Sequence, residues 1–318
     1  MLGNSPAVAA ASSGGFKLNG ASFTPARIAE LAKMDGGIVL DDSWGTIVAA
    51  NVHFVPDGSI PTDETGARHR TAERLAVETE KPVVAVSEGR RVATLFYAGE
   101  KLELAQPTEV AAHINQELQS LDRLRSRLDE AEGRLTRLEV AGLASYRGVV
   151  TVVQRAELVE RLGRQVASRA LTLGDEGRIV TLQLNDLLSG VDRTLRLVLQ
   201  DYLKPLRKNS VERALERLVE LSGSDLEDQA RVGRELSFPD LDERAIARGH
   251  RILAQVGRLP DSVREEIVKH FGSVTKIINS SEERLRNVEG VGDTRAEQLR
   301  SFLDRLKATA HEWEPVLE

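Results

Sequence analysis

The feature that most limits how this chain folds is a long periodic run of aliphatic residues after Pro107. Such spacing places the side chains on one face of a helix with 3.6 residues per turn. A coiled coil would use this face, but we favour packing onto neighbouring helices. The residues recur at steps of three, four or seven between Glu, Arg and Asp: Ile114, Leu118, Leu121, Leu124, Leu128, Leu135 and Leu138.

Further helical patterns follow at 149–170, 181–203 and 210–221. We therefore expect an elongated all-helical spine over residues 107–246, and we find no catalytic constellation in it. The boundary at Pro107 divides the 318-residue chain, a length typical of two or three domains.

The segment before Pro107 has the pattern of an α/β domain. Runs rich in β-branched residues lie between Gly, Pro, Asp or Ser, which is typical of strands. Segments with helical spacing lie between them, and Thr24 followed by Pro25 is a typical helix start. We expect a mixed sheet flanked by helices over residues 1–106. The expected strands are 36–40, 46–55, 81–88 and 91–99, and the expected helices are 24–34 and 70–80.

Composition excludes several classes of protein. Aromatic residues make up only 4% of the chain, so its cores must be aliphatic. A net charge of −6 argues against a protein that coats nucleic acid. The absence of cysteine excludes disulfides and thiolate sites. The first 15 residues lack the basic and apolar regions of a signal peptide, and no apolar run reaches membrane-spanning length. We therefore expect a cytoplasmic protein.

The last segment, 247–318, reads as short helices separated by glycine-containing turns. In one unit Gly290, Val291 and Gly292 form a tight turn between two helices, and 257–273 is a more degenerate version. Such turns present backbone amides to a DNA phosphate, and Arg295 and Arg300 would assist. Eleven Lys or Arg stand against twelve Asp or Glu from 250 to 318, so contacts with DNA would be few and non-specific. The alternative is that these hairpins only pack on each other.

A cluster of cationic side chains follows Gly66 and runs into the helix expected at 70–80. Arg68, His69 and Arg70 stand where the helix dipole is already positive, which suits a polyphosphate. Arginine offers forked donors that match phosphate oxygens. The alternative is that the arginines are solvated or pair with Asp63, Glu64 and Glu73.

Two further stretches are candidates for the same site. Asp35 precedes Gly36, Gly37 and a buried-type strand, so it suits a divalent cation near a ligand that approaches the backbone. Ser87 and Glu88 close another strand at its carboxyl end, where ligands gather in open α/β sheets. Taken alone, Asp-Gly is also an ordinary turn, and the second signal is weak.

Together these stretches resemble a known family. Residues 31–40, 50–76 and 81–89 closely resemble the catalytic domain of the DNA-integrity scanning diadenylate cyclases, the DisA family. The order of domains also matches: cyclase, helical spine and helix-hairpin-helix module, here 1–106, 107–246 and 247–318. The resemblance covers almost the whole chain.

The resemblance implies that two ATP molecules are joined into cyclic di-AMP with release of two pyrophosphates. Asp35 matches the aspartate that binds Mg²⁺ or Mn²⁺ and helps to activate the 3′-hydroxyl. Arg68, His69 and Arg70 are implied catalytic residues. The implied nucleotide contacts are Gly36, Gly37, Phe54, Ala67, Arg68, His69, Arg70, Thr71, Ser87 and Glu88.

The resemblance also implies partners. Because each site holds one ATP, two cyclase domains must face each other in a two-fold contact. Family members assemble such dimers into an octamer through the spine. The implied partners are ATP, a second copy of the chain, and DNA, including branched DNA, bound without sequence specificity. The implied location is cytoplasmic and nucleoid-associated.

The chain departs from the family pattern at three places. Gly37 stands where the family has alanine, and Ala67 stands where it has threonine. The chain also starts late, so that Met1, Leu2 and Gly3 match the end of a strand that the family places first. We expect the cyclase domain to be truncated at its start.

Two other functions remain open. One is a DNA-binding scaffold whose cyclase domain is inactive, because of the late start or of Ala67. The other is a different ATP-using enzyme such as a kinase, against which stands the lack of a phosphate-binding Gly-Lys-Ser/Thr loop and of kinase motifs.

Overall fold

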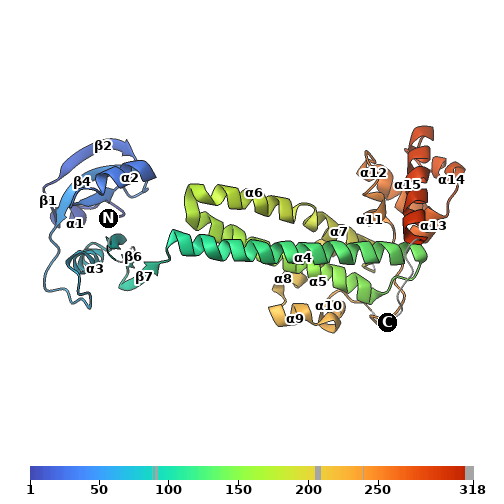
Figure 1. The fold of residues 1–318 in the computed structure, drawn as a ribbon, viewed down its shortest axis with the longest axis horizontal. Coiled ribbons are helices and arrows are strands. Elements are labelled where there is room, and N and C mark those ends of the chain that lie inside the picture. Colours follow the sequence, from blue (N-terminus) through green and yellow to red (C-terminus); the bar gives the residue numbers. More distant parts are fainter. Residues whose placement is uncertain (88, 90–91, 205–208, 239, 312–318) are drawn as a thin grey trace. The chain divides into compact units, whose positions relative to one another are not determined.

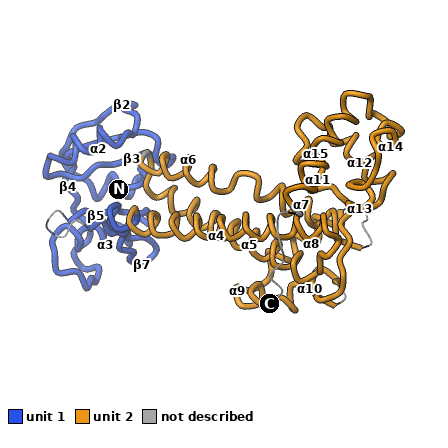
Figure 2. The backbone as a smooth tube through the Cα atoms, turned by 45° about the vertical axis from the view of Figure 1, so that its right-hand side comes forward, with its two compact units in different colours: residues 1–110 blue, residues 111–318 orange. Residues whose placement is uncertain are grey.

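The computed structural model describes residues 1–87, 89, 92–204, 209–238 and 240–311. The chain forms two compact units, Met1–Val110 and Ala111–Glu318, coloured separately in Figure 2. The first unit contains the strands, and the second unit contains helices (Figure 1).

The first sheet of unit 1 is built around the long strand β4 (Thr46–Phe54). Ile47 and Ala50 are completely buried and Val52 is nearly so, because this central strand is covered by neighbours. Helices α1 (Pro6–Ala10) and α2 (Pro25–Leu31) occur in the same part of the chain as these strands. Thr24 caps α2, and Pro25 is its first residue, as predicted. Three strands pair antiparallel with β4: β1 (Ser12–Ser13), β2 (Phe16–Ser22) and β3 (Gly37–Leu40).

The second sheet is a three-stranded antiparallel meander of β5 (Val83–Ser87), β6 (Val92–Tyr97) and β7 (Glu100–Leu104). Residues at the chain start link the two sheets. Leu2 forms a parallel bridge with Leu40 of β3, and its amide donates to the carbonyl of Pro82 over 2.9 Å. The Met1 amine donates to the carbonyl of Ile38 over 3.0 Å.

The α/β class of this unit is confirmed, but its sheet differs from the one expected. Among the described residues, the ladders of both sheets are antiparallel, and parallel pairing occurs only at the Leu2 bridge. Two antiparallel sheets therefore replace the single mixed sheet that the sequence predicts, and Leu2, which contacts both Leu40 and Pro82, lies between β3 and β5.

Helix α3 (Ala67–Thr79) closes the core of unit 1. Its inward residues Ala72, Leu75 and Ala76 are buried. They join one cluster with side chains from both sheets, among them Val39, Val52, Val83, Ala85 and Phe96. The helix therefore lies against the sheets with its N-terminus at the loop that leaves β4.

The second unit begins within the helix α4 (Pro107–Ala141), which at 1.5 Å per residue is about 50 Å long. Ile114, Leu121, Leu128 and Leu135 of the aliphatic run are at most 1% exposed. Figures 1 and 2 both show α6 (Gly177–Leu188) running beside α4. Packing onto neighbouring helices is thus confirmed over a coiled coil. Hydrogen bonds also join α4 to α5 (Tyr146–Ala170) and α7 (Val191–Tyr202). The helices η1 (Leu171–Glu176) and α8 (Ser210–Glu220) belong to the same unit.

Glycine divides one helical pattern that the sequence presents as continuous. The run at 181–203 contains two helices, which meet at Gly190 with φ 77°. Arg125 of α4 secures this break, because its guanidinium donates to the carbonyls of Leu187 and Ser189 over 3.1 and 2.7 Å. Two short helices, α9 (Gly223–Glu227) and α10 (Gln229–Glu235), complete this part.

The end of the chain forms helices that are short except for the last, and glycine lies in three of the four connections between them, at Gly257, Gly272 and Gly290. No described helix is both long and apolar enough to span a membrane. The helices are α11 (His250–Leu253), α12 (Asp261–Phe271), α13 (Val274–Ile278), α14 (Glu282–Arg286) and α15 (Asp293–His311).

Candidate functional site

The N-terminus of α3 has the geometry of an anion site. Gly66 occupies the cap position, and because glycine has no side chain, no side chain caps the helix. The first turn of α3 contains no acidic residue. The first intrahelical bond runs from the Arg70 amide to the Gly66 carbonyl over 2.9 Å. Ala67, Arg68 and Arg70 are exposed around this uncapped end. A positive dipole end and two guanidinium groups therefore face solvent together.

The loop that leads into α3 is held by side chains of α3 itself. Arg74 donates to the carbonyl of Ile60 over 2.7 Å, and Glu78 accepts from the amide of Asp57 over 2.7 Å. Glu73 accepts from the hydroxyl of Thr62. These contacts fix the direction in which the chain enters the helix.

Two of the three carboxylates considered as partners for the arginines have other partners in the structure. Glu64 pairs with Lys101, and Glu73 binds Thr62. Arg70 instead donates to the backbone carbonyls of Glu64 and Thr65 over 3.4 and 3.2 Å. The cationic character of the helix start is therefore retained.

Asp35 lies beside this helix start. Its carboxylate is 3.3 Å from the Arg68 guanidinium, and the Asp35 side chain is fully exposed while that of Arg68 is 65% exposed. An ion pair this exposed adds little to stability, so folding alone does not account for it. The structure thus brings together two predicted motifs that are 33 residues apart in the chain.

Gly36 and Gly37 are needed for space. A Cβ atom on Gly36 would lie 2.4 Å from the backbone carbonyl carbon of Asn51, and one on Gly37 would lie 2.0 Å from Cε2 of Phe54. Neither glycine has a positive φ, so a special backbone conformation is not the reason for either. Both glycines therefore let the start of β3 approach β4 closely, directly after Asp35.

The remaining predicted nucleotide contacts lie at different depths. His69 is only 6% exposed, and its ring meets Phe96 edge-on with centroids 6.2 Å apart. Thr71 on α3 and Ser87 at the end of β5 are half-buried. Glu88 lies outside the described residues. The burial of His69 gives it contact with the core rather than the exposed position of Arg68 and Arg70.

A metal at this site would have one protein carboxylate. Within the described parts of the chain, no three His, Cys, Asp or Glu side chains are grouped as metal ligands. The exposed Asp35 carboxylate is a hard oxygen donor of the kind that Mg²⁺ and Mn²⁺ prefer. One carboxylate fits a cation that is otherwise bound by substrate phosphates.

The predicted DNA contacts surround the turn between α14 and α15. Gly290 has φ 81°, and a Cβ there would lie 2.9 Å from Val263. Arg295 donates to the Gly290 carbonyl over 2.7 Å, and Val291 is buried. Gly292, the residue before α15, has open space around it. The turn is therefore rigid, with Gly292 accessible.

Arg300 of α15 forms hydrogen bonds within the protein in the same region. It donates to the carbonyls of Ile278 and Ser280 over 3.1 and 2.6 Å and binds the carboxylate of Asp304 twice. These bonds use four of its five N–H groups, and its side chain is 18% exposed. Its interactions therefore serve the fold, a use that the sequence pattern did not reveal.

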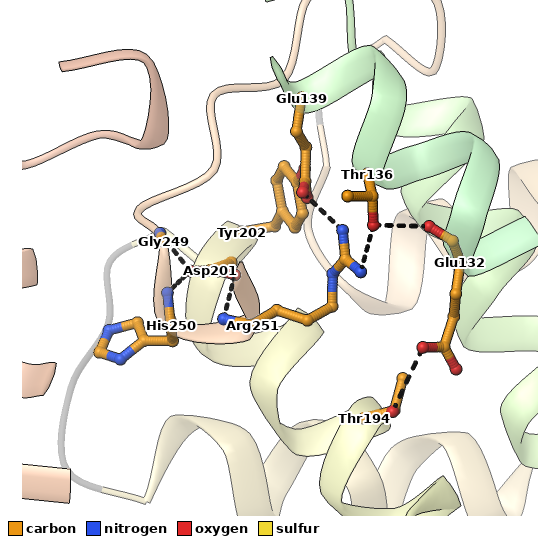
Figure 3. Close-up of polar contacts among 9 residues, drawn as sticks. All are labelled: Glu132, Thr136, Glu139, Thr194, Asp201, Tyr202, Gly249, His250 and Arg251. Carbon is orange, nitrogen blue, oxygen red and sulfur yellow. Dashed lines mark hydrogen bonds and ion pairs between the residues drawn. The ribbon is translucent and has the colours of Figure 1, made fainter. Parts of the chain in front are cut away.

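A buried polar cluster in unit 2 was also missed (Figure 3). Asp201 of α7 accepts backbone amides of Gly249, His250 and Arg251 at the start of α11 over 2.7, 2.7 and 3.0 Å. Arg251 binds the Glu139 carboxylate of α4 over 2.5 Å, and both side chains are at most 4% exposed. Burial raises the pKa of Glu139 and of Asp201. No local pattern predicts the cluster, because its members come from three separated segments.

Comparison with known proteins places this geometry in context. Residues 1–101 match a family model described as DisA bacterial checkpoint controller nucleotide-binding, and residues 104–244 match one described as DisA bacterial checkpoint controller linker region. Proteins named DNA integrity scanning protein DisA are similar over 96% of this chain. The one from Frankia alni is 40% identical over 86% of its length, that from Streptomyces coelicolor 40% over 83%, and that from Kineococcus radiotolerans 41% over 86%.

Proposed function

Because the chain belongs to the DisA family, we propose that it is a diadenylate cyclase that converts two ATP molecules into cyclic di-AMP and two pyrophosphates. The observation that carries the proposal is the Asp35–Arg68 pair at the uncapped start of α3. It combines a carboxylate, guanidinium groups and backbone donors, which are the groups that phosphoryl transfer requires.

The exposed cations bind the polyphosphate. Arg68 and Arg70, with the amides of the first turn of α3, offset the charge of the phosphates. Asp35 accepts the proton of the 3′-hydroxyl, whose oxygen forms a bond to the α-phosphorus of the other nucleotide. The bond from that phosphorus to the β-phosphate bridging oxygen breaks, and pyrophosphate leaves with the electron pair. His69, held in the core, positions the helix turn that bears the arginines.

The apolar and backbone parts of the site bind the nucleoside. Gly36 and Gly37 allow close approach to the backbone, and Phe54 offers a ring to the base or ribose. Ala67, Thr71 and Ser87 complete the predicted contacts. In the bound state Asp35 would hold Mg²⁺ or Mn²⁺ together with the phosphates, and such an ion supplies charge stabilisation for the transferring group.

The reaction requires two sites, since each site holds one ATP. We propose that two nucleotide-binding units meet head to head in an isologous contact, and that the helical unit extends this dimer to an octamer. The turn at Gly290–Gly292 supports a second proposed activity, non-sequence-specific binding of DNA through its phosphates.

Ala67 favours one alternative. A threonine hydroxyl at this position would donate to a phosphate, and a hydrogen bond to a charged group contributes about 1.5–3 kcal/mol. Its loss would reduce turnover, and in the extreme the chain would act as a DNA-binding scaffold with an inactive cyclase domain.

The test is incubation of the purified protein with ATP and Mn²⁺ or Mg²⁺, with the product identified by chromatography and mass spectrometry. We expect cyclic di-AMP from the wild type and none from Asp35→Asn, whose exposed position predicts an unchanged melting temperature. Asp122→Asn, an exposed carboxylate on α4, is the matched control and should retain activity. Near-normal synthesis by Asp35→Asn at saturating metal would refute the assigned role, and no product from the wild type would favour the scaffold.

A further inference from the structure

The loop before α3 contains a carboxylate close enough to interfere with the anion site. Glu64 stands two residues before the cap residue Gly66, and its side chain is only 12% exposed. The guanidinium of Arg70 lies at the backbone of the same residue, because its Nε atom donates to the Glu64 carbonyl over 3.4 Å. A carboxylate at this position can compete with a phosphate for Arg70.

Lys101 of β7 directs this carboxylate elsewhere. Its ammonium group forms an ion pair with the Glu64 carboxylate. Lys101 lies opposite Phe96 of β6, and residues directly opposite in an antiparallel ladder share a face of the sheet. The Phe96 ring contacts the ring of His69 in the first turn of α3, so this face of the sheet packs against the helix. Lys101 therefore reaches the loop from the face that also supports the helix start.

The backbone of Glu64 is held by α3, whereas its side chain is held by β7. The Glu64 amide donates to the hydroxyl of Thr62 over 3.1 Å, and that hydroxyl donates to the Glu73 carboxylate of α3. The Glu64 carbonyl accepts from Arg70 of the same helix. A largely buried carboxylate is poorly hydrated, so without Lys101 it would turn toward the guanidinium of Arg70.

We infer that Lys101 is a positioning residue for the polyphosphate: by holding the Glu64 carboxylate, it keeps Arg70 and the start of α3 available to the phosphates of ATP. This inference rests on the proposed function and adds to it a residue of β7 that acts without touching the substrate. Because Lys101 acts through Glu64, its effect requires the Glu64 carboxylate. Because it acts on phosphate binding, inorganic triphosphate is affected as ATP is.

A double-mutant cycle tests this role, with the variants Lys101→Met, Glu64→Gln and the double variant. Methionine keeps an apolar stem and removes the charge, and Lys101→Arg is the conservative variant. Lys81→Met is the matched control, because Lys81 pairs with Asp42 over 2.8 Å just past the other end of α3. Calorimetry measures binding of inorganic triphosphate to the full chain with Mg²⁺ present. The melting temperature and the KM for ATP are measured in parallel.

We expect Lys101→Met to weaken triphosphate binding about tenfold, which corresponds to about 1.4 kcal/mol, and to raise the KM for ATP by a similar factor. Lys101→Arg should bind triphosphate as the wild type does, since its charge holds the same carboxylate. In the Glu64→Gln background, Lys101→Met should have little effect, because no carboxylate competes for Arg70. The melting temperature of Lys101→Met should stay close to that of Lys81→Met, so that unfolding does not explain the lost affinity.

The inference is overturned if Lys101→Met has the same effect with and without the Glu64 carboxylate, because Lys101 would then act on the phosphates directly. It is also overturned if Lys101→Met binds triphosphate as Lys81→Met does, if Lys101→Arg fails to restore binding, or if the wild type binds no triphosphate. Binding of triphosphate by the wild type without synthesis of cyclic di-AMP from ATP would refute the proposed function, and the cycle would still decide the role of Lys101.

Discussion

Replacement of Asp201 by asparagine tests the buried polar cluster of unit 2 most directly. Asn has the shape of Asp but only one acceptor oxygen. The Asp201 Oδ1 atom accepts the amides of Gly249 and His250, and Oδ2 accepts the amide of Arg251. In the variant, the side-chain NH₂ group would face the amide of Arg251, so that donor would lose its partner.

The size of the effect follows from these bonds. A hydrogen bond to a charged group contributes about 1.5–3 kcal/mol and a neutral one about 0.5–1.5 kcal/mol, so two weakened bonds cost about 2 kcal/mol. The unsatisfied amide of Arg251 adds about 1–3 kcal/mol. Relief of the burial cost that raises the pKa of Asp201 offsets part of this loss. We expect the free energy of unfolding to fall by about 3 kcal/mol.

The assay is urea unfolding followed by circular dichroism at the helix band, combined with hydrogen exchange of peptides that cover residues 247–256. The unfolding midpoint of Asp201→Asn should fall, and amides at the start of α11 should exchange faster. Asp192→Asn, an exposed carboxylate on the same helix, is the control and should leave both readouts nearly unchanged. An unchanged midpoint together with unchanged exchange at Gly249–Arg251 would refute the stated role of the carboxylate.

The cluster also bears on how the chain can be divided. Arg248 donates to the carbonyls of Gln200, Asp201 and Leu203 at the end of α7. Asp201 binds the start of α11 in return. A cut at residue 247 would therefore leave buried groups of the spine without partners, so point variants test DNA binding better than a deletion.

Three further predictions concern other residues. Burial, with the nearby Arg264 and Arg248, lowers the pKa of His250 to about 4, while Glu265 opposes the shift. The unfolded chain therefore takes up a proton on this histidine at a higher pH than the folded chain does. As the pH falls from about 6.5 toward 4, the free energy of unfolding should decrease by about 2 kcal/mol. Urea unfolding across that range should show this slope for the wild type and not for His250→Gln, and equal slopes would contradict it. Arg68→Ala and Arg70→Ala should each raise the KM for ATP, and Ala67→Thr should lower it or raise kcat in steady-state assays; no gain from threonine would mean that the departure is silent. Gly292→Asp, which adds a negative charge in open space at the start of α15, should weaken DNA binding in a salt-dependent gel-shift titration, whereas Gly223→Asp, also in open space, should not; equal binding by both variants would place the DNA contact elsewhere.

Sequence patterns predicted the elements whose signals are local. They are the aliphatic run after Pro107, the helix start at Thr24 and Pro25, and the strand predicted at 46–55, which the structure ends at Phe54. Periodicity and capping, which neighbouring residues determine, are sufficient for these elements. β7 was missed because its five residues are all exposed and three of them are Glu or Lys, which are depleted in strands. α1 and β2 were missed because small and polar residues give them little periodicity.

In the candidate site too, local sequence was sufficient for some features, and others depend on tertiary contacts. The sequence by itself determined the cationic helix start at Arg68 and Arg70 and the Asp35-Gly36-Gly37 stretch, because residue type and order are sufficient for these motifs. Only the tertiary structure decided that Asp35 meets Arg68, that the Phe54 ring fills the space beside Gly37, and that Arg300 binds carbonyls of Ile278 and Ser280. Such contacts join residues that are far apart in the chain, and they depend on how β3, β4 and the helices pack, which no local pattern encodes.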